Sequence, residues 1–210
     1  MMPFGLRTPV VAVLLHVTGI LTGGRHGLHV VSMCLPLANT SVCTPWQQGA
    51  VNVSSSMSIR DFDMALNAWA ESNEHIAGFN AAYGCTWDGV GIRYAHSYGC
   101  AERLWMNDYA CNSDLMAQDD ATFRPLCTSS CQYYQASMGR ILNDPTICAA
   151  EPTAAQSDAR SATLDYIASF CANFSRSYNC STLPSEHNRC GWANATVKGI
   201  VDYCAKLHDQ

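Results

Sequence analysis

The chain has 210 residues, of which 48% are hydrophobic and only 14% are charged, and its formal net charge at pH 7 is -5. This length and balance indicate one domain with a sizeable apolar core and exclude an intrinsically disordered chain. A mildly acidic protein without a run of lysines and arginines is repelled by phosphate backbones, so nucleic acid is not an expected partner.

The N-terminal residues have the pattern of a secretory signal peptide. Arg7 provides the positive flank, and an apolar stretch from Val10 to Leu21 follows it. This stretch is short for a membrane span, so we expect cleavage after about residue 24, or as late as residue 38, with an uncleaved anchor as the alternative. The polar C-terminus has no lipid-anchor signal. We therefore expect residues 39–210 to form a secreted domain without a stable membrane span after cleavage.

Twelve cysteines spread along the whole chain predict disulfide bonds formed in an oxidising compartment. Early cleavage keeps all twelve, whereas cleavage after Ala38 removes Cys34 and leaves an odd thiol. Structural zinc is disfavoured because Cys127 and Cys131 form the only close pair, and no metal or other cofactor is expected. The sequence leaves the pairing open. The cysteines are Cys34, Cys43, Cys85, Cys100, Cys111, Cys127, Cys131, Cys148, Cys171, Cys180, Cys190 and Cys204.

Five Asn-X-Ser/Thr sequons agree with secretion and predict N-linked glycans at the protein surface. The sequon at Asn179 is the weakest, because Cys180, a predicted disulfide partner, occupies its middle position. The sequons start at Asn39, Asn52, Asn173, Asn179 and Asn194.

Hydrophobic periodicity predicts an all-α or mainly α domain of about five helices with long loops and no convincing pair of strands. The clearest helix begins with a capping box of Ser58 and Asp61 and ends at Gly84. Cys127 and Cys131 lie one turn apart on the third helix, so we expect them to bond to different partners. The predicted helices span residues 58–83, 92–109, 125–142, 159–171 and 192–207.

The sequence carries no strong catalytic signature. It has no nucleophile elbow, no zinc-protease helix motif, no phosphate-binding loop and no dinucleotide-binding glycine pattern. His75 follows Glu71 by four residues, which suggests an acid–base pair, but an exposed helical pair explains the spacing more simply. His187 lies in a predicted loop without a nucleophile. Catalysis is therefore uncertain, and a non-enzyme is favoured.

Two tryptophans are candidate contacts for a partner. Trp46 lies in the predicted entry segment, and Trp87 lies in the tight segment after Cys85. Exposed tryptophans are frequent anchors of protein interfaces. The alternative is that both rings pack over disulfides near the surface.

One part of the sequence resembles a known family. The run Ser97-Tyr98-Gly99-Cys100, then Cys111, then Pro125-Leu126-Cys127-Thr128-Ser129-Ser130-Cys131 leading into a helix resembles the later half of frizzled-type and folate-receptor-type cysteine-rich domains. The opening Cys43-Thr44-Pro45-Trp46 before a long helix resembles secreted fungal proteins related to those domains. The first similarity covers residues 97–148. The resemblance implies a helical, disulfide-rich recognition module, and no ligand-groove residue is carried over.

Together these features predict a secreted, glycosylated, cysteine-rich binding module that acts at a cell surface or on a host. Its partner would be an extracellular protein, a glycan or a small ligand. The alternatives are an extracellular hydrolase with an unrecognised site near His75 or His187, and a structural or adhesive surface protein.

Overall fold

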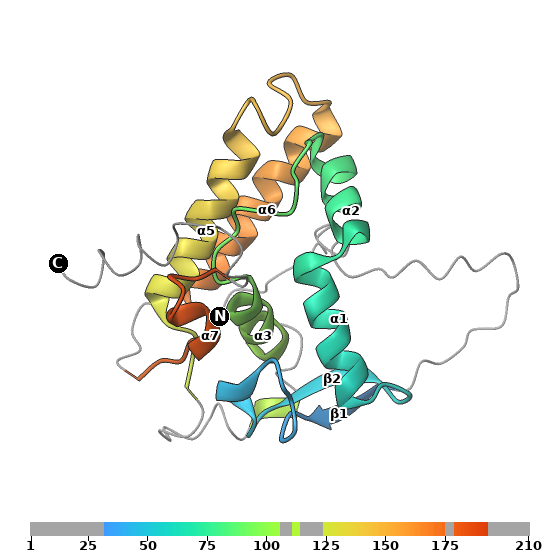
Figure 1. Cartoon of the computed structure of the whole chain (residues 1–210), viewed down its shortest axis with the longest axis vertical. Coiled ribbons are helices and arrows are strands. Elements are labelled where there is room, and N and C mark those ends of the chain that lie inside the picture. The colour runs from blue at the N-terminus through green and yellow to red at the C-terminus, as the bar shows by residue number, and fades with distance from the viewer. Residues whose placement is uncertain (1–31, 106–110, 114–123, 175–178, 193–210) are drawn as a thin grey trace, which may run out of the picture.

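The computed structural model of the chain describes residues 32–105, 111–113, 124–174 and 179–192. Helices dominate this part, which confirms the predicted mainly α, disulfide-rich fold class. In Figure 1, α5 and α6 run side by side, α1 and α2 line the opposite side, and the small sheet lies at one end below α3. The elements are β1 (Ser32–Pro36), η2 (Thr44–Trp46), β2 (Ala50–Ser54), α1 (Ile59–Glu71), α2 (Asn73–Tyr83), α3 (Ala95–Trp105), α5 (Thr128–Asn143), α6 (Ala154–Ala172) and α7 (Pro184–His187).

The long helix predicted over residues 58–83 is two helices, α1 and α2, separated at Ser72. The predicted capping box is present at the start of α1: the Ser58 hydroxyl accepts the N–H of Asp61 at 3.2 Å, and the Asp61 carboxylate accepts the N–H of Ser58 at 3.0 Å. Ser72 has an extended backbone, and its hydroxyl accepts the N–H of His75 at 3.1 Å. Ser72 therefore ends α1 and caps α2.

The strands β1 and β2 form a two-stranded antiparallel sheet that the sequence did not predict. Cys34 pairs with Asn52, and Leu35 pairs with Val51, whose side chain lies in the core. The apolar alternation in both strands is too short to stand out from a loop. Because β1 precedes residue 39, the folded part of the chain includes residues that signal cleavage after residue 38 would remove.

The later helices differ from the prediction mainly at their ends. α3 and α5 occupy the second and third predicted helices. α6 begins at Ala154 rather than residue 159, because Thr153 and Gln156 form a second capping box at its start. α7 was predicted as a loop. Apart from its first residue, the predicted helix 192–207 lies outside the described residues.

α3 is the most buried helix and lies at the centre of the core. Eight of its eleven residues are buried and none is exposed, so the helix has no polar face of ordinary width. Gly99 permits close contact with α1, since a Cβ at this position would lie 2.9 Å from side-chain atoms of both Leu66 and Trp69. On the other side of α3, Tyr98 stacks on Tyr134 of α5, with their ring centroids 3.9 Å apart.

α7 is joined to the start of α3 by a buried carboxylate. The side chain of Glu186 is 1% exposed and accepts the N–H groups of His96 at 3.0 Å and Ser97 at 2.9 Å. In return, the Ser97 hydroxyl accepts the N–H of Leu183 at 3.0 Å. The first N–H groups of a helix lack partners within it, and the helix dipole favours negative charge there. Glu186 therefore stabilises α3 from a segment far along the chain.

We expect Glu186→Gln to lower the free energy of unfolding by about 2 kcal/mol, because a hydrogen bond to a charged group contributes roughly 1.5–3 kcal/mol and glutamine keeps one acceptor oxygen. Urea denaturation of the non-reduced protein measures the change. Glu74→Gln, at an exposed position in the first turn of α2, is the matched control. An equal loss of stability in the two variants would show that the buried Glu186 carboxylate stabilises the fold no more than an exposed carboxylate does.

Candidate binding site

The described cysteines are all in disulfides, as predicted. Because Cys34 is bonded, signal cleavage after Ala38 would remove one half of a disulfide. Cys190 is disulfide-bonded too, and Cys204 lies outside the described residues. The five described bonds are Cys34–Cys111, Cys43–Cys100, Cys85–Cys148, Cys127–Cys180 and Cys131–Cys171.

The expectation that Cys127 and Cys131 bond to different partners is confirmed. Cys131 joins α5 to Cys171 near the end of α6, and Cys127 joins the start of α5 to Cys180. α5 is therefore fixed to two separate segments within one turn of helix. So many disulfides are typical of extracellular proteins.

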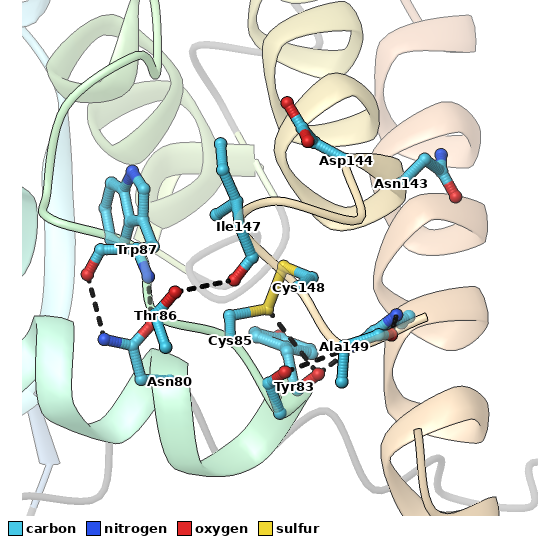
Figure 2. The surroundings of a disulfide bond; sticks show 12 residues. Asn80, Tyr83, Cys85, Thr86, Trp87, Asn143, Asp144, Ile147, Cys148 and Ala149 are labelled. Carbon is cyan, nitrogen blue, oxygen red and sulfur yellow. Dashed lines mark hydrogen bonds between the residues drawn. A yellow bond between two sulfur atoms is a disulfide. The ribbon is translucent and has the colours of Figure 1, made fainter. Parts of the chain in front are cut away.

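The disulfide between Cys85 and Cys148 joins the turn after α2 to the loop after α5 (Figure 2). The two cysteines lie opposite each other in a short antiparallel bridge. The N–H of Thr86 donates to the carbonyl of Ile147 at 2.7 Å on one side of the bond, and the N–H of Ala149 donates to the residue before Cys85 at 2.9 Å on the other. Backbone hydrogen bonds thus hold the two segments together beside the disulfide.

The prediction that Trp46 and Trp87 are exposed is wrong, and neither ring is available to a partner in this structure. Trp46 is 0% exposed, and its Nε1–H donates to the carbonyl of Arg124 at 2.8 Å. Trp87 is 3% exposed, packs on Phe79 and donates its Nε1–H to the carbonyl of Val90 at 2.6 Å. Both rings instead lie in the hydrophobic core, where each donates to a backbone carbonyl.

His75 and Glu71 do not lie on one helix as the sequence suggested. The two residues belong to different helices, α2 and α1, because Ser72 interrupts the helix between them. The His75 ring lies against Trp69 and Trp87, with centroid distances of 5.8 and 6.3 Å. Burial among these rings lowers the pKa of His75, so the neutral imidazole is favoured.

His187 lies at the exposed end of α7, next to the inward-turned Glu186. The structure does not bring His187 and His75 together: in Figure 1, α7 and α2 lie on opposite sides of the molecule. In the described residues no three metal-binding side chains gather at one place.

Four of the predicted glycosylation residues lie in the described part of the chain, and all are exposed: Asn39, Asn52, Asn173 and Asn179. Asn194 lies outside it. Glycans at these positions would not displace core side chains, and glycosylation stays a prediction.

A second group of titratable side chains lies inside the helical layers. Burial raises the pKa of Glu102, and a hydrogen bond with Tyr166 opposes this effect. The hydroxyl of Tyr98 is buried and has no hydrogen-bond partner. Glu102 and Tyr166 are half-buried, and the Tyr98 ring packs on Tyr134 of α5 and Phe170 of α6, so we assign these groups to the contacts between the helices.

A shallow polar groove lies where three distant segments of the chain meet. Its volume is about 760 Å³. We call it the polar groove. Its lining residues are Thr44, Pro45, Gln48, Arg124, Ser181, Thr182 and Pro184.

The backbone beneath the polar groove is tightly fixed. The bond from Trp46 to the Arg124 carbonyl joins two of the segments. The third is joined by hydrogen bonds from the N–H of Ser181 to the carbonyl of Pro125 at 2.7 Å and from the N–H of Cys127 to the carbonyl of Ser181 at 3.0 Å. The disulfides at Cys43 and Cys127 add covalent restraints beside the same segments.

The lining of the polar groove combines hydroxyl, amide and guanidinium groups with two prolines. These groups supply both donors and acceptors of hydrogen bonds. The Thr182 hydroxyl shares a hydrogen bond of 2.7 Å with Ser130, which orients it. The groove therefore presents polar groups beside apolar surface. The groove was not predicted from the sequence, although two of its segments lie in the stretches that resemble the cysteine-rich family.

Comparison with known proteins finds no matching family model, no matching curated protein and no matching solved structure. Among the described helices, none has the length and apolar character needed to cross a membrane. The function must therefore be inferred from the chain's own geometry.

Proposed function

We propose that the protein is a secreted recognition module and that the polar groove binds its extracellular ligand. The observation that carries this proposal is the construction of the groove, whose three segments are joined by hydrogen bonds and flanked by disulfides. A surface that is ordered before binding loses little conformational entropy when a ligand arrives. The disulfides support an extracellular setting.

The lining of the groove indicates the kind of ligand. A shallow surface that carries hydroxyl, amide and guanidinium groups favours a glycan or a polar protein segment over a lipid, because a polar ligand can exchange hydrogen bonds with such groups and a lipid tail cannot. The resemblance to fungal relatives of frizzled-type domains points to the same class of protein, a recognition module at a cell surface or on a host.

Thr44→Trp is expected to block the polar groove. Thr44 is exposed and lines the groove, so the larger side chain fills it without entering the core. We expect binding of the labelled, secreted protein to a printed array of glycans and extracellular proteins to weaken by at least about tenfold, or about 1.4 kcal/mol.

The control is Asn67→Trp, which places the same side chain at an exposed position of α1. Its binding should equal that of the unchanged protein. Ligands that bind all three proteins equally would contradict the proposal that the groove is the binding site.

A further inference from the structure

An arginine and two tyrosines form an ordered stack at the surface, separate from the residues of the polar groove. Tyr133 on α5 is 46% exposed, and its ring stacks on that of Tyr94, with the centroids 6.0 Å apart and the planes at 19°. The guanidinium carbon of Arg93 lies 4.1 Å from the centroid of Tyr133 and 5.7 Å from that of Tyr94. We call these three residues the Arg–Tyr stack.

The backbone under the Arg–Tyr stack is strained. Tyr94 and Cys190 are the two non-glycine residues with positive φ in the described chain, at 56° and 52°. They lie together, because the N–H of Tyr94 donates to the carbonyl of Gly191, and Nε–H of Arg93 donates to the carbonyl of Cys190, each at 2.6 Å. The left-handed conformation is unfavourable for a non-glycine residue, because it brings the Cβ too close to the following carbonyl oxygen. Such strain clusters at ligand-binding surfaces.

Position 94 holds a tyrosine, although glycine would adopt the left-handed backbone conformation at a lower free-energy cost. The ring of Tyr94 is almost fully buried and supports the exposed ring of Tyr133 from below. Gly191 makes room for it, since a Cβ at position 191 would overlap the ring of Tyr94. The fold thus accepts backbone strain that holds the exposed tyrosine and its arginine in one arrangement.

The chemistry of the Arg–Tyr stack fits a carboxylate. A guanidinium stacked on an aromatic ring still presents its N–H groups in the plane, where a carboxylate accepts two hydrogen bonds. Glu186, an acidic residue that acts electrostatically on Tyr94, is buried and accepts the N–H groups at the start of α3. A second arginine, Arg140, lies on the same helix as Tyr133 and bonds to the carbonyl of Gly91 at 3.2 Å. Asp144 lies within electrostatic reach of Arg140, so the positive charge of the Arg–Tyr stack is that of Arg93.

We propose that the Arg–Tyr stack is a docking surface for a protein that presents carboxylate side chains. Tyrosine and arginine are enriched among the residues that contribute most to protein–protein binding. Ordering before association reduces the entropy that binding costs. This surface acts independently of the polar groove, so either can exist without the other.

The test uses fluorescence anisotropy with labelled hexaglutamate and hexaglutamine peptides at low salt, and the full secreted protein. We expect hexaglutamate to bind at least about tenfold more tightly than hexaglutamine. Tyr133→Ala and Arg93→Lys should each weaken hexaglutamate binding by about fivefold or more. Arg93→Lys keeps the charge but loses the planar stack.

Arg60→Ala and Met64→Ala, at exposed positions of α1, are the matched controls and should leave the affinity within about twofold. Thermal unfolding checks that each variant is folded. If Arg93→Lys proves unstable, the test relies on Tyr133→Ala, which removes only a half-exposed ring. Equal affinity for the two peptides, or equal losses in the α1 controls, would overturn the proposal. Tighter binding of oligogalacturonate than of hexaglutamate would also overturn it, in favour of an acidic glycan.

Discussion

Trp46→Ala is expected to lower the free energy of unfolding by about 4 kcal/mol, within the range measured for truncating large buried aromatic residues. Trp46 is completely buried, so alanine leaves a large cavity in the core. The substitution also removes the partner of the Arg124 carbonyl and so loosens the floor of the polar groove. Urea denaturation of the non-reduced protein, followed by far-ultraviolet circular dichroism, measures the effect.

Trp46→Phe is the informative comparison, because it keeps most of the apolar volume and loses the Nε1–H donor. We expect a loss of about 2 kcal/mol, from the smaller cavity and the unpaired carbonyl. A loss below about 1 kcal/mol for Trp46→Ala would contradict the buried position of Trp46 and favour its role as an exposed partner contact.

The double substitution Cys85→Ser and Cys148→Ser is expected to cost about 4 kcal/mol by the loop-entropy relation. The two cysteines are 63 positions apart in the chain, and none of the other four described disulfides shortens the loop between them. The unfolded chain therefore gains the full freedom of this loop. Chemical denaturation of the doubly substituted protein, with the remaining disulfides intact, gives the value.

Thr86→Ala is the control for this double substitution. It changes an exposed side chain beside the disulfide and leaves the cysteines in place. We expect it to change stability by less than about 0.5 kcal/mol. If the double substitution lowers the free energy of unfolding no more than Thr86→Ala does, the Cys85–Cys148 disulfide does not restrict the unfolded chain as the loop-entropy relation assumes.

Features that depend on neighbouring residues could be predicted from the sequence. The capping box of Ser58 and Asp61 requires only residues within one turn of helix, and it is present. The different partners of Cys127 and Cys131 also followed from their spacing. In both cases the geometry of a single helical turn was enough to predict the contact or the bond.

The break at Ser72 shows where the hydrophobic pattern misled. The apolar stripe continues in phase from α1 into α2, so periodicity alone predicted one helix. Ser72 is itself a good N-cap residue. A capping residue inside a long predicted helix was the one sign in the sequence that the first helix ends and a second one begins there. In physical terms, the hydroxyl bond to the His75 N–H competes with helix continuation.

Features that depend on distant residues could not be predicted. The bond from Trp46 to Arg124 spans 78 positions, and the bond from Glu186 to His96 spans 90. Both bury a side chain whose local sequence resembles a loop. The polar groove and the Arg–Tyr stack arise in the same way, since each collects residues from segments that only the folded chain brings together.

The order of the cross-links has a consequence for proteolysis. Two described disulfides lie wholly before residue 112, two lie wholly after residue 126, and among the five only Cys85–Cys148 connects these groups. A peptidase that cuts once between residues 112 and 126 would therefore produce two fragments still held by this single covalent bond. This one disulfide therefore keeps the two fragments covalently joined after such a cut.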